Sequence, residues 1–155
     1  MHPDIFMCRK GYYALNVQAV VDSDMRFIDV VSKWPGSQHD FAIFEACGLK
    51  RYLEENNVGH LLGDSRYPLR QHLLTPVIQP ADQREKAYNV AHAKGRGVNE
   101  CAFGVLKARF RCLHRSGVCL PFKPGKCANV ILACMRLHNM CIDADIQLED
   151  VPQLE

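Results

Sequence analysis

Alternating apolar and polar positions predict two strands near the start of the chain. In residues 12–21 the odd-numbered positions are apolar or aromatic, namely Tyr13, Leu15, Val17, Ala19 and Val21. This period of two is typical of a half-buried strand. A second such run, residues 27–34, follows the polar segment 22–24, whose sequence Asp-Ser-Asp is typical of a turn. Two strands joined by so short a turn predict an antiparallel hairpin.

Helical periodicity begins after the hairpin. Residues 37–55 predict a single helix in which Ser37 is the N-cap and Asp40, three residues later, stands in the place of a capping-box acid. The apolar side of this helix consists of Phe41, Phe44, Leu49 and Leu53. A short strand is expected at residues 60–64 and a weaker one at residues 73–78.

Residues 84–113 predict a long helix that Gly95 and Gly97 interrupt. Two neighbouring apolar stripes in its second half indicate that it is heavily buried. One stripe contains Val98, Cys101, Val105, Ala108 and Cys112, and the other contains Phe103, Leu106, Phe110 and Leu113. The remaining face carries Glu100, Gly104, Lys107 and Arg111.

A last helix is predicted over residues 126–142, and its inward positions are Val130, Cys134, Leu137 and Cys141. Residues 143–155 contain five acids and no base, and we expect a mobile acidic tail. The order of the elements indicates a mixed α/β fold. Three or four strands are few for a sheet that must cover two long helices, so we expect the sheet to be incomplete.

The composition is that of one ordinary globular domain. The chain has 155 residues, of which 48 % are hydrophobic and 23 % charged, enough apolar residues for a core. No apolar run reaches the roughly 18–20 residues that span a bilayer. Because the first residues lack the apolar segment of a signal peptide, we expect no secretion and reduced thiols.

Eight cysteines raise the question of a metal site, although none are in a Cys-x-x-Cys pair. Cys134, His138 and Cys141 are spaced to lie on one helical face. They could hold zinc, or they could be buried thiols beside a packed histidine. Their apolar neighbours favour the second interpretation.

The net charge of +2 hides an uneven distribution. Residues 84–126 contain ten basic and two acidic residues. Such a basic block indicates a polyanionic partner, most often nucleic acid, although a solvated helix face would have the same composition.

Three carboxylates are candidates for chemistry. Asp64 follows the short strand, Glu100 lies on the long helix, and Asp40 begins the first helix. Each also has a simpler explanation: a turn aspartate, an ion-pair partner of helix cations, and a helix-capping acid. Grouped carboxylates hold Mg²⁺ or Mn²⁺, and such ions promote phosphodiester cleavage. Neighbouring cations, here Lys107, Arg109 and Arg111, would contact the phosphate backbone.

Several short motifs occur in a characteristic order. They are Lys-Gly-Tyr-Tyr-Ala-Leu-Asn-Val-Gln-Ala-Val from residue 10, Gly-Ser-Gln-His-Asp from 36, Leu-Gly-Asp-Ser-Arg-Tyr-Pro-Leu from 62, Tyr-Asn-x-x-His from 88, Glu-x-x-Phe-Gly-x-Leu-Lys-x-Arg-Phe from 100, and Leu-His-Asn from 137. The set strongly resembles the DDE endonuclease domain of PIF/Harbinger-type transposases and the Harbinger transposase-derived nuclease family. The resemblance covers residues 8–142.

The resemblance implies a ribonuclease H-like mixed sheet flanked by helices, and a metal-dependent nuclease that hydrolyses DNA. By motif, Asp64 and Glu100 match catalytic acids, and Asp40 joins them as a ligand of Mg²⁺ or Mn²⁺. Arg66 stands where members of the family often have glycine. A Myb-like DNA-binding partner and a location in the nucleus, also in the cytoplasm, are further expectations.

The family's first catalytic aspartate lies on the first sheet strand, in a run that this sequence lacks. We therefore expect a domain that is incomplete at its N-terminus, and a chain that binds metal but cleaves DNA poorly. The alternative is a non-catalytic nucleic-acid-binding or protein-interaction domain. A small zinc protein built on the cysteines is the third hypothesis.

Overall fold

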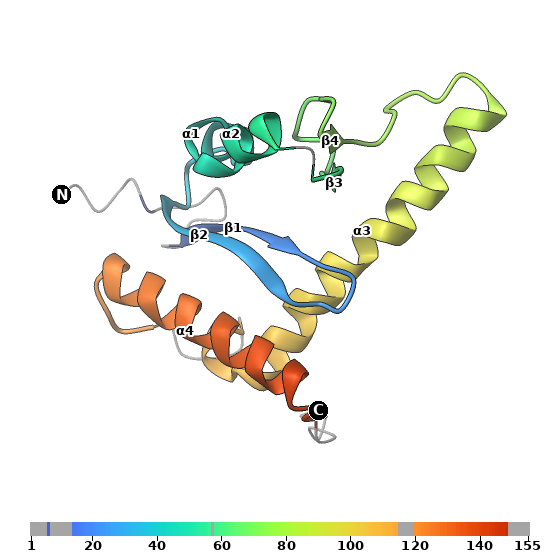
Figure 1. The fold of residues 1–155 in the computed structure, drawn as a ribbon. Coiled ribbons are helices and arrows are strands. Elements are labelled where there is room, and N and C mark those ends of the chain that lie inside the picture. Colours follow the sequence, from blue (N-terminus) through green and yellow to red (C-terminus); the bar gives the residue numbers. More distant parts are fainter. Residues whose placement is uncertain (1–5, 7–13, 57, 115–119, 149–155) are drawn as a thin grey trace.

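A computed structural model describes residue 6 and residues 14–56, 58–114 and 120–148. Two strands, β1 (Leu15–Val21) and β2 (Phe27–Pro35), form an antiparallel hairpin at the centre of the fold (Figure 1). In the turn, Asp22 Oδ1 accepts hydrogen bonds from the backbone N–H groups of Asp24 and Arg26, each at 2.9 Å. The predicted hairpin is confirmed, although residues 12 and 13 of its first strand lie outside the described residues.

The last helix, α4 (Pro124–Asp143), packs across one face of the hairpin (Figure 1). Two polar side chains of α4 hold the start of β2. Asn139 Oδ1 accepts from the Phe27 N–H at 2.9 Å, while Asn139 Nδ2 donates to the Phe27 carbonyl at 3.0 Å. The imidazole of His138 is fully buried, with Nε2 3.0 Å from the Met25 carbonyl. The Leu-His-Asn motif therefore attaches α4 to the hairpin.

The main core lies between the hairpin, α4 and the second half of the long helix. Its buried residues are Phe27, Ala102, Leu106, Cys134 and Met135. Leu137, which we expected to face inward, is 47 % exposed. The buried face of α4 runs through Ala128, Cys134, Met135 and His138, so the contacts with β2 turn Leu137 outward.

The predicted helix over residues 37–55 is in fact two helices, α1 (Asp40–Ala46) and α2 (Gly48–Glu55). The helical conformation is interrupted at Cys47, which has an extended backbone (φ −92°, ψ 157°). This break allows Phe44 of α1 and Leu53 of α2 to enter the same small apolar cluster, together with Leu73. The N-cap of α1 is His39, not Ser37 as predicted, so Asp40 is the first helical residue.

A second, smaller sheet lies beside these helices. Strand β3 (Leu61–Leu62) pairs in parallel with β4 (Leu73–Leu74). Both strands are shorter than the sequence predicts. Within the described ranges the four strands make two separate two-stranded sheets. The fold is therefore mixed α/β with small sheets and helices.

The long helix α3 (Gln83–Arg109) runs without interruption through Gly95 and Gly97, contrary to the prediction. A Cβ atom at Gly95 would lie 2.6 Å from Leu62 Cδ1, so this glycine allows β3 to approach α3 closely. A short 3₁₀ turn, η2 (Arg111–Leu113), follows α3.

Only one of the two predicted apolar stripes of α3 faces the core. Leu106 is buried, and Phe103, Phe110 and Leu113 pack against the same cluster, whereas Cys101 and Cys112 are exposed. The prediction of a heavily buried second stripe is therefore wrong at Cys101 and Cys112, while the remaining members of that stripe, Val98, Val105 and Ala108, are half-buried. None of the helices in the described part of the chain is both long and apolar enough to cross a membrane.

Candidate metal and nucleic-acid site

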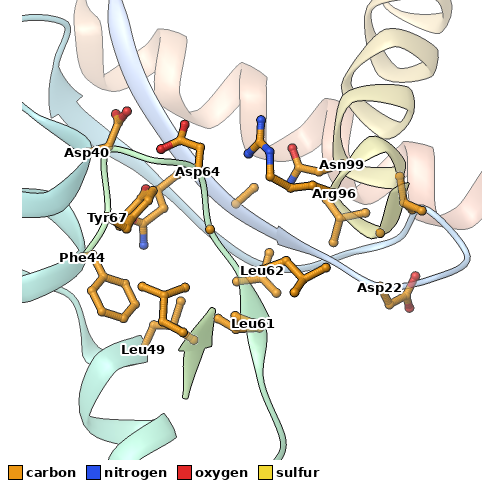
Figure 2. Close-up of a pocket in the computed structure, with 18 of the residues that line it drawn as sticks. Asp22, Asp40, Phe44, Leu49, Leu61, Leu62, Asp64, Tyr67, Arg96 and Asn99 are labelled. Carbon is orange, nitrogen blue, oxygen red and sulfur yellow. The ribbon is translucent and has the colours of Figure 1, made fainter. Parts of the chain in front are cut away.

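A cavity of about 580 Å³ lies between β1, β3, α1 and α3. Its walls include Asp40 from the start of α1, Asp64 from the segment after β3, and Arg96 and Asn99 from α3 (Figure 2). Figure 2 shows the carboxylates of Asp40 and Asp64 close together, with the side chains of Arg96 and Asn99 on the neighbouring wall. The fold thus brings two of the three predicted acids into one cleft.

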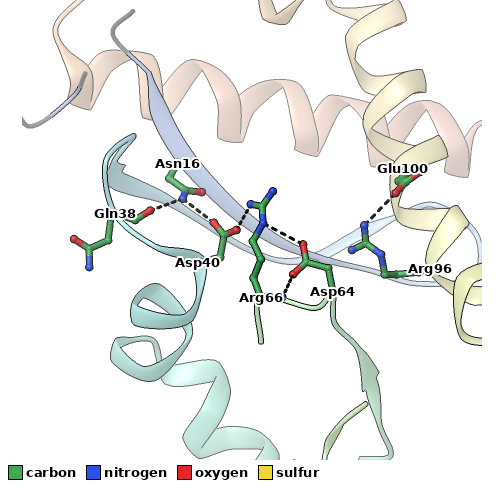
Figure 3. A network of polar contacts seen from close by, with 7 residues as sticks. All are labelled: Asn16, Gln38, Asp40, Asp64, Arg66, Arg96 and Glu100. Carbon is green, nitrogen blue, oxygen red and sulfur yellow. Dashed lines mark hydrogen bonds and ion pairs between the residues drawn. The ribbon is translucent and has the colours of Figure 1, made fainter. Parts of the chain in front are cut away.

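Asp40 is held by contacts from other elements. Asn16 of β1 donates one Nδ2 hydrogen bond to Asp40 Oδ1 at 2.8 Å and another to the Gln38 carbonyl at 3.0 Å (Figure 3). The second carboxylate oxygen, Oδ2, accepts from Arg66 Nη1 at 2.6 Å. The capping-box explanation of Asp40 is wrong because the N-cap is His39 rather than Ser37, although Asp40 is still an acid in the first turn of α1.

Asp64 begins the turn after β3. Its Oδ1 accepts the backbone N–H of Arg66 at 2.9 Å, and its carbonyl accepts the N–H of Tyr67 at 3.1 Å. Asp64 is thus a turn aspartate, as one interpretation of the sequence holds, and its Oδ2 still faces the cleft, 4.0 Å from Arg66 Nε. The turn role and a ligand role are compatible for this residue.

Arg66 connects the two carboxylates (Figure 3). The hydrogen bond and charge of Asp40, followed by the charge of Asp64, raise the pKa of its guanidinium. Burial, and then the charges of Asp40 and Asp64, also raise the pKa of the neighbouring Tyr67 hydroxyl. Tyr67 is therefore protonated and uncharged at neutral pH.

Glu100 lies apart from this pair. Its side chain is 73 % exposed and accepts from Arg96 Nη2 at 3.0 Å, one turn earlier on α3. The cavity wall contains Arg96 and Asn99 but not Glu100. No group of three or more His, Cys, Asp or Glu side chains able to hold a metal occurs within the described residues. The ion-pair explanation of Glu100 thus describes its contact here, although its partner is Arg96 rather than Lys107 or Arg111.

The three predicted phosphate-contacting cations differ in their surroundings. Lys107 on α3 and Arg111 in η2 are both exposed. Arg109 instead donates from Nη2 to the Ile146 carbonyl and holds the segment that follows α4. Lys107 and Arg111 are therefore available to a partner, while Arg109 has a structural contact.

The Cys134, His138 and Cys141 group has no geometry for zinc. His138 Nε2 is hydrogen-bonded to the Met25 carbonyl, and the described residues contain no metal-binding cluster. Burial, and then the nearby thiol of Cys112, raise the pKa of Cys134 to about 11. The second interpretation of the sequence, thiols packed beside a buried histidine, therefore describes this region.

The sequence reasoning missed three polar residues of the cleft: Asn16, Arg96 and Asn99. A signal for Asn16 is present, because Asn16 and Gln18 are the polar residues on one face of an otherwise apolar strand. That face is directed toward α1, where Asn16 orients Asp40. The signal for Arg96 is weaker, since it stands among many cations.

Fold and site together define a mixed α/β protein in which a cleft with two carboxylates lies beside a helix rich in basic residues. A comparison with family models gives the particular class. The model described as "DDE superfamily endonuclease" matches residues 1–139. The chain belongs to that family, and the resemblance stated from its motifs is confirmed.

The relatives agree with this assignment. The mouse protein named "Putative nuclease HARBI1" is 37 % identical over 149 residues, which are 95 % of this chain and 43 % of that protein. Its human counterpart is 36 % identical over the same shares, and the Arabidopsis thaliana "Protein ALP1-like" is 31 % identical over 90 % of this chain and 38 % of its own length. The chain thus spans less than half the length of these curated relatives. No solved structure matches it.

Proposed function

We propose that the chain is part of a divalent-metal-dependent nuclease that hydrolyses phosphodiester bonds of DNA. The observation that carries this proposal is that Asp40 of α1 and Asp64 of the turn after β3 line the same cleft. Two neighbouring carboxylates need a positive charge beside them. Arg66 supplies that charge in this structure, and a divalent cation can supply it in its place.

The two carboxylates of the cleft fit a hard divalent cation, which proteins often bind through one or two carboxylates and water. Asp40 and Asp64 would hold Mg²⁺ or Mn²⁺ there, and Glu100, which lies outside the cleft wall in this structure, would join them as the third ligand. Glu100 is on an exposed helix face, so its side chain is free to exchange Arg96 for another cation at small cost. A bound ion would supply an activated water and would stabilise the leaving oxygen.

The chain's own residues account for phosphate binding. Arg96 and Asn99 face the cleft and can donate hydrogen bonds to a phosphate that lies there. Lys107 near the end of α3 and Arg111 in η2 are exposed cations, and they would contact the backbone of the same DNA. Asn16 keeps the Asp40 carboxylate oriented, and Asp64 is held by its own turn.

The proposal also includes the type of sheet, the location in the cell and a protein partner. A ribonuclease H-like sheet is supported by the order of an antiparallel hairpin, a helical segment, a parallel strand pair and two long helices. A nuclear location, extending to the cytoplasm, and a Myb-like DNA-binding partner remain predictions that follow from the family.

Nicking of supercoiled plasmid in the presence of Mn²⁺ tests the proposal. We expect weak cleavage, since the sequence lacks the run that contains the family's first catalytic aspartate. This cleavage should disappear in Glu100→Gln and Asp64→Asn and persist in Glu54→Gln, a control at an exposed acid of α2. Cleavage that survives both site substitutions would assign the activity elsewhere.

The position of Glu100 favours a second hypothesis, a non-catalytic nucleic-acid-binding domain. Glu100 is paired with Arg96 and lies outside the cleft wall. Salt-dependent DNA binding by the wild-type chain, without nicking at any Mn²⁺ concentration, would favour this alternative over the enzyme.

A further inference from the structure

We propose that the guanidinium of Arg66 is a built-in competitor of the divalent cation, and that metal binding requires Arg66 to leave Asp40 and Asp64. This inference rests on the proposed function, since it concerns the same two carboxylates. It assigns to Arg66 a role in setting the affinity of the site.

The geometry places Arg66 where a cation would lie. Its Nη1 is 2.6 Å from Asp40 Oδ2, and its Nε is 4.0 Å from Asp64 Oδ2, so one positive group contacts both acids (Figure 3). A metal ion bound to both carboxylates needs the oxygen atoms that face Arg66. The two cations therefore exclude each other, because like charges cannot share these oxygens at contact distance.

The turn after β3 delivers Arg66 to this position. Its backbone N–H is bound by Asp64 Oδ1 at 2.9 Å, so the residue starts from a fixed point beside the site. Its side chain is 72 % exposed, whereas the side chains of Asp40 and Asp64 are 20 % and 29 % exposed. The carboxylates are thus held in the cleft, while the arginine can swing into water.

The exposure of Arg66 limits the strength of its competition. Ion pairs between solvent-exposed groups are weak, because water and salt screen them. Arg66 should therefore lower the apparent metal affinity roughly 3- to 10-fold without abolishing binding. A divalent ion with more coordinating bonds displaces it at sufficient concentration.

Calorimetric titration with Mn²⁺ alone tests this inference independently of any cleavage. We expect Arg66→Gln to bind Mn²⁺ roughly 3- to 10-fold more tightly than the wild-type chain at low salt. The matched control is Arg70→Gln, in the same segment, whose guanidinium lies 3.7 Å from Glu45 and faces neither carboxylate. This control removes the same charge from the chain, but water and salt screen the charge of Arg70 from the cleft. The Mn²⁺ affinity of Arg70→Gln should therefore stay within about 2-fold of wild type.

The possible outcomes separate the inference from the proposed function. Equal or weaker binding in Arg66→Gln, or an equal gain in Arg70→Gln, overturns the inference while the metal site stands. Undiminished binding in an Arg66→Gln, Asp64→Asn double variant places the ion elsewhere and overturns both, as does a failure of wild type and Arg66→Gln alike to bind. Circular dichroism melting curves of each variant confirm that the compared proteins are folded.

Discussion

Replacing Asn139 by alanine should destabilise the fold strongly, because this side chain satisfies both backbone groups of one core residue. Phe27 is only 6 % exposed, and Asn139 supplies the partner of its N–H at 2.9 Å and of its carbonyl at 3.0 Å. A buried polar group without a partner costs about 1–3 kcal/mol. Two such groups predict a loss of about 2–6 kcal/mol, a large part of the roughly 5–15 kcal/mol that stabilises a domain.

Urea unfolding followed by far-ultraviolet circular dichroism measures this loss directly. The control is Asn129→Ala, at an exposed position of the same helix, which should change the free energy of unfolding by less than about 0.5 kcal/mol. If Asn139→Ala costs no more than this control, the side chain does not carry the attachment of α4 to the hairpin.

A second substitution at the same position tests the pairing itself. Asn139→Asp keeps an acceptor for the N–H of Phe27 but sets a second oxygen against the Phe27 carbonyl, where Nδ2 now donates at 3.0 Å. At neutral pH this repulsion should cost at least as much as the alanine substitution. A protonated carboxyl can donate, so the deficit relative to wild type should shrink as the pH falls toward 4. A deficit independent of pH would refute the reasoning.

Three further predictions concern a turn, a buried histidine and the basic face. Gly36→Ala places a Cβ atom 2.7 Å from the Ala14 carbonyl oxygen and should lower the unfolding free energy by about 1–3 kcal/mol in urea titrations, because backbone must move. Burial chiefly lowers the pKa of His138. In the unfolded chain the same imidazole has a pKa near 6.5 and binds a proton more readily. The melting temperature should therefore fall as the pH drops from 7 to 5, and it should fall less in His138→Gln. Removing Lys107 and Arg111 together should reduce the slope of log DNA affinity against log salt by about 2, measured by fluorescence anisotropy.

Each of these has its own control. Gly48→Ala, at a site with open space around it, should be neutral or stabilising, since alanine is the better helix former. An equal acid sensitivity of the wild-type chain and His138→Gln would assign the effect to other groups. Arg109→Ala should lower stability rather than the salt slope, because Arg109 binds the Ile146 carbonyl.

Much of this protein was predictable from the sequence because the relevant signals are local. The hairpin follows from strict alternation and a polar turn, and strand pairing over such a short connection has few alternatives. The exposure of Glu100 and Lys107 follows from helical periodicity. Arg111 is exposed as well, but it lies in η2, beyond the end of α3. The family membership follows from the order and spacing of short motifs, which can be recognised in the sequence without knowing any tertiary contact.

The tertiary structure decided what depends on residues far apart in the chain. The break at Cys47 exists because Phe44 and Leu53 must reach the same cluster, and helical periodicity on either side does not reveal it. The sequence predicts a capping role for Asp40 because its neighbours suit one, but its partners Asn16 and Arg66 come from β1 and from the turn after β3. A carboxylate's role is set by the charges within a few ångströms of it, and only the folded chain determines which charges those are.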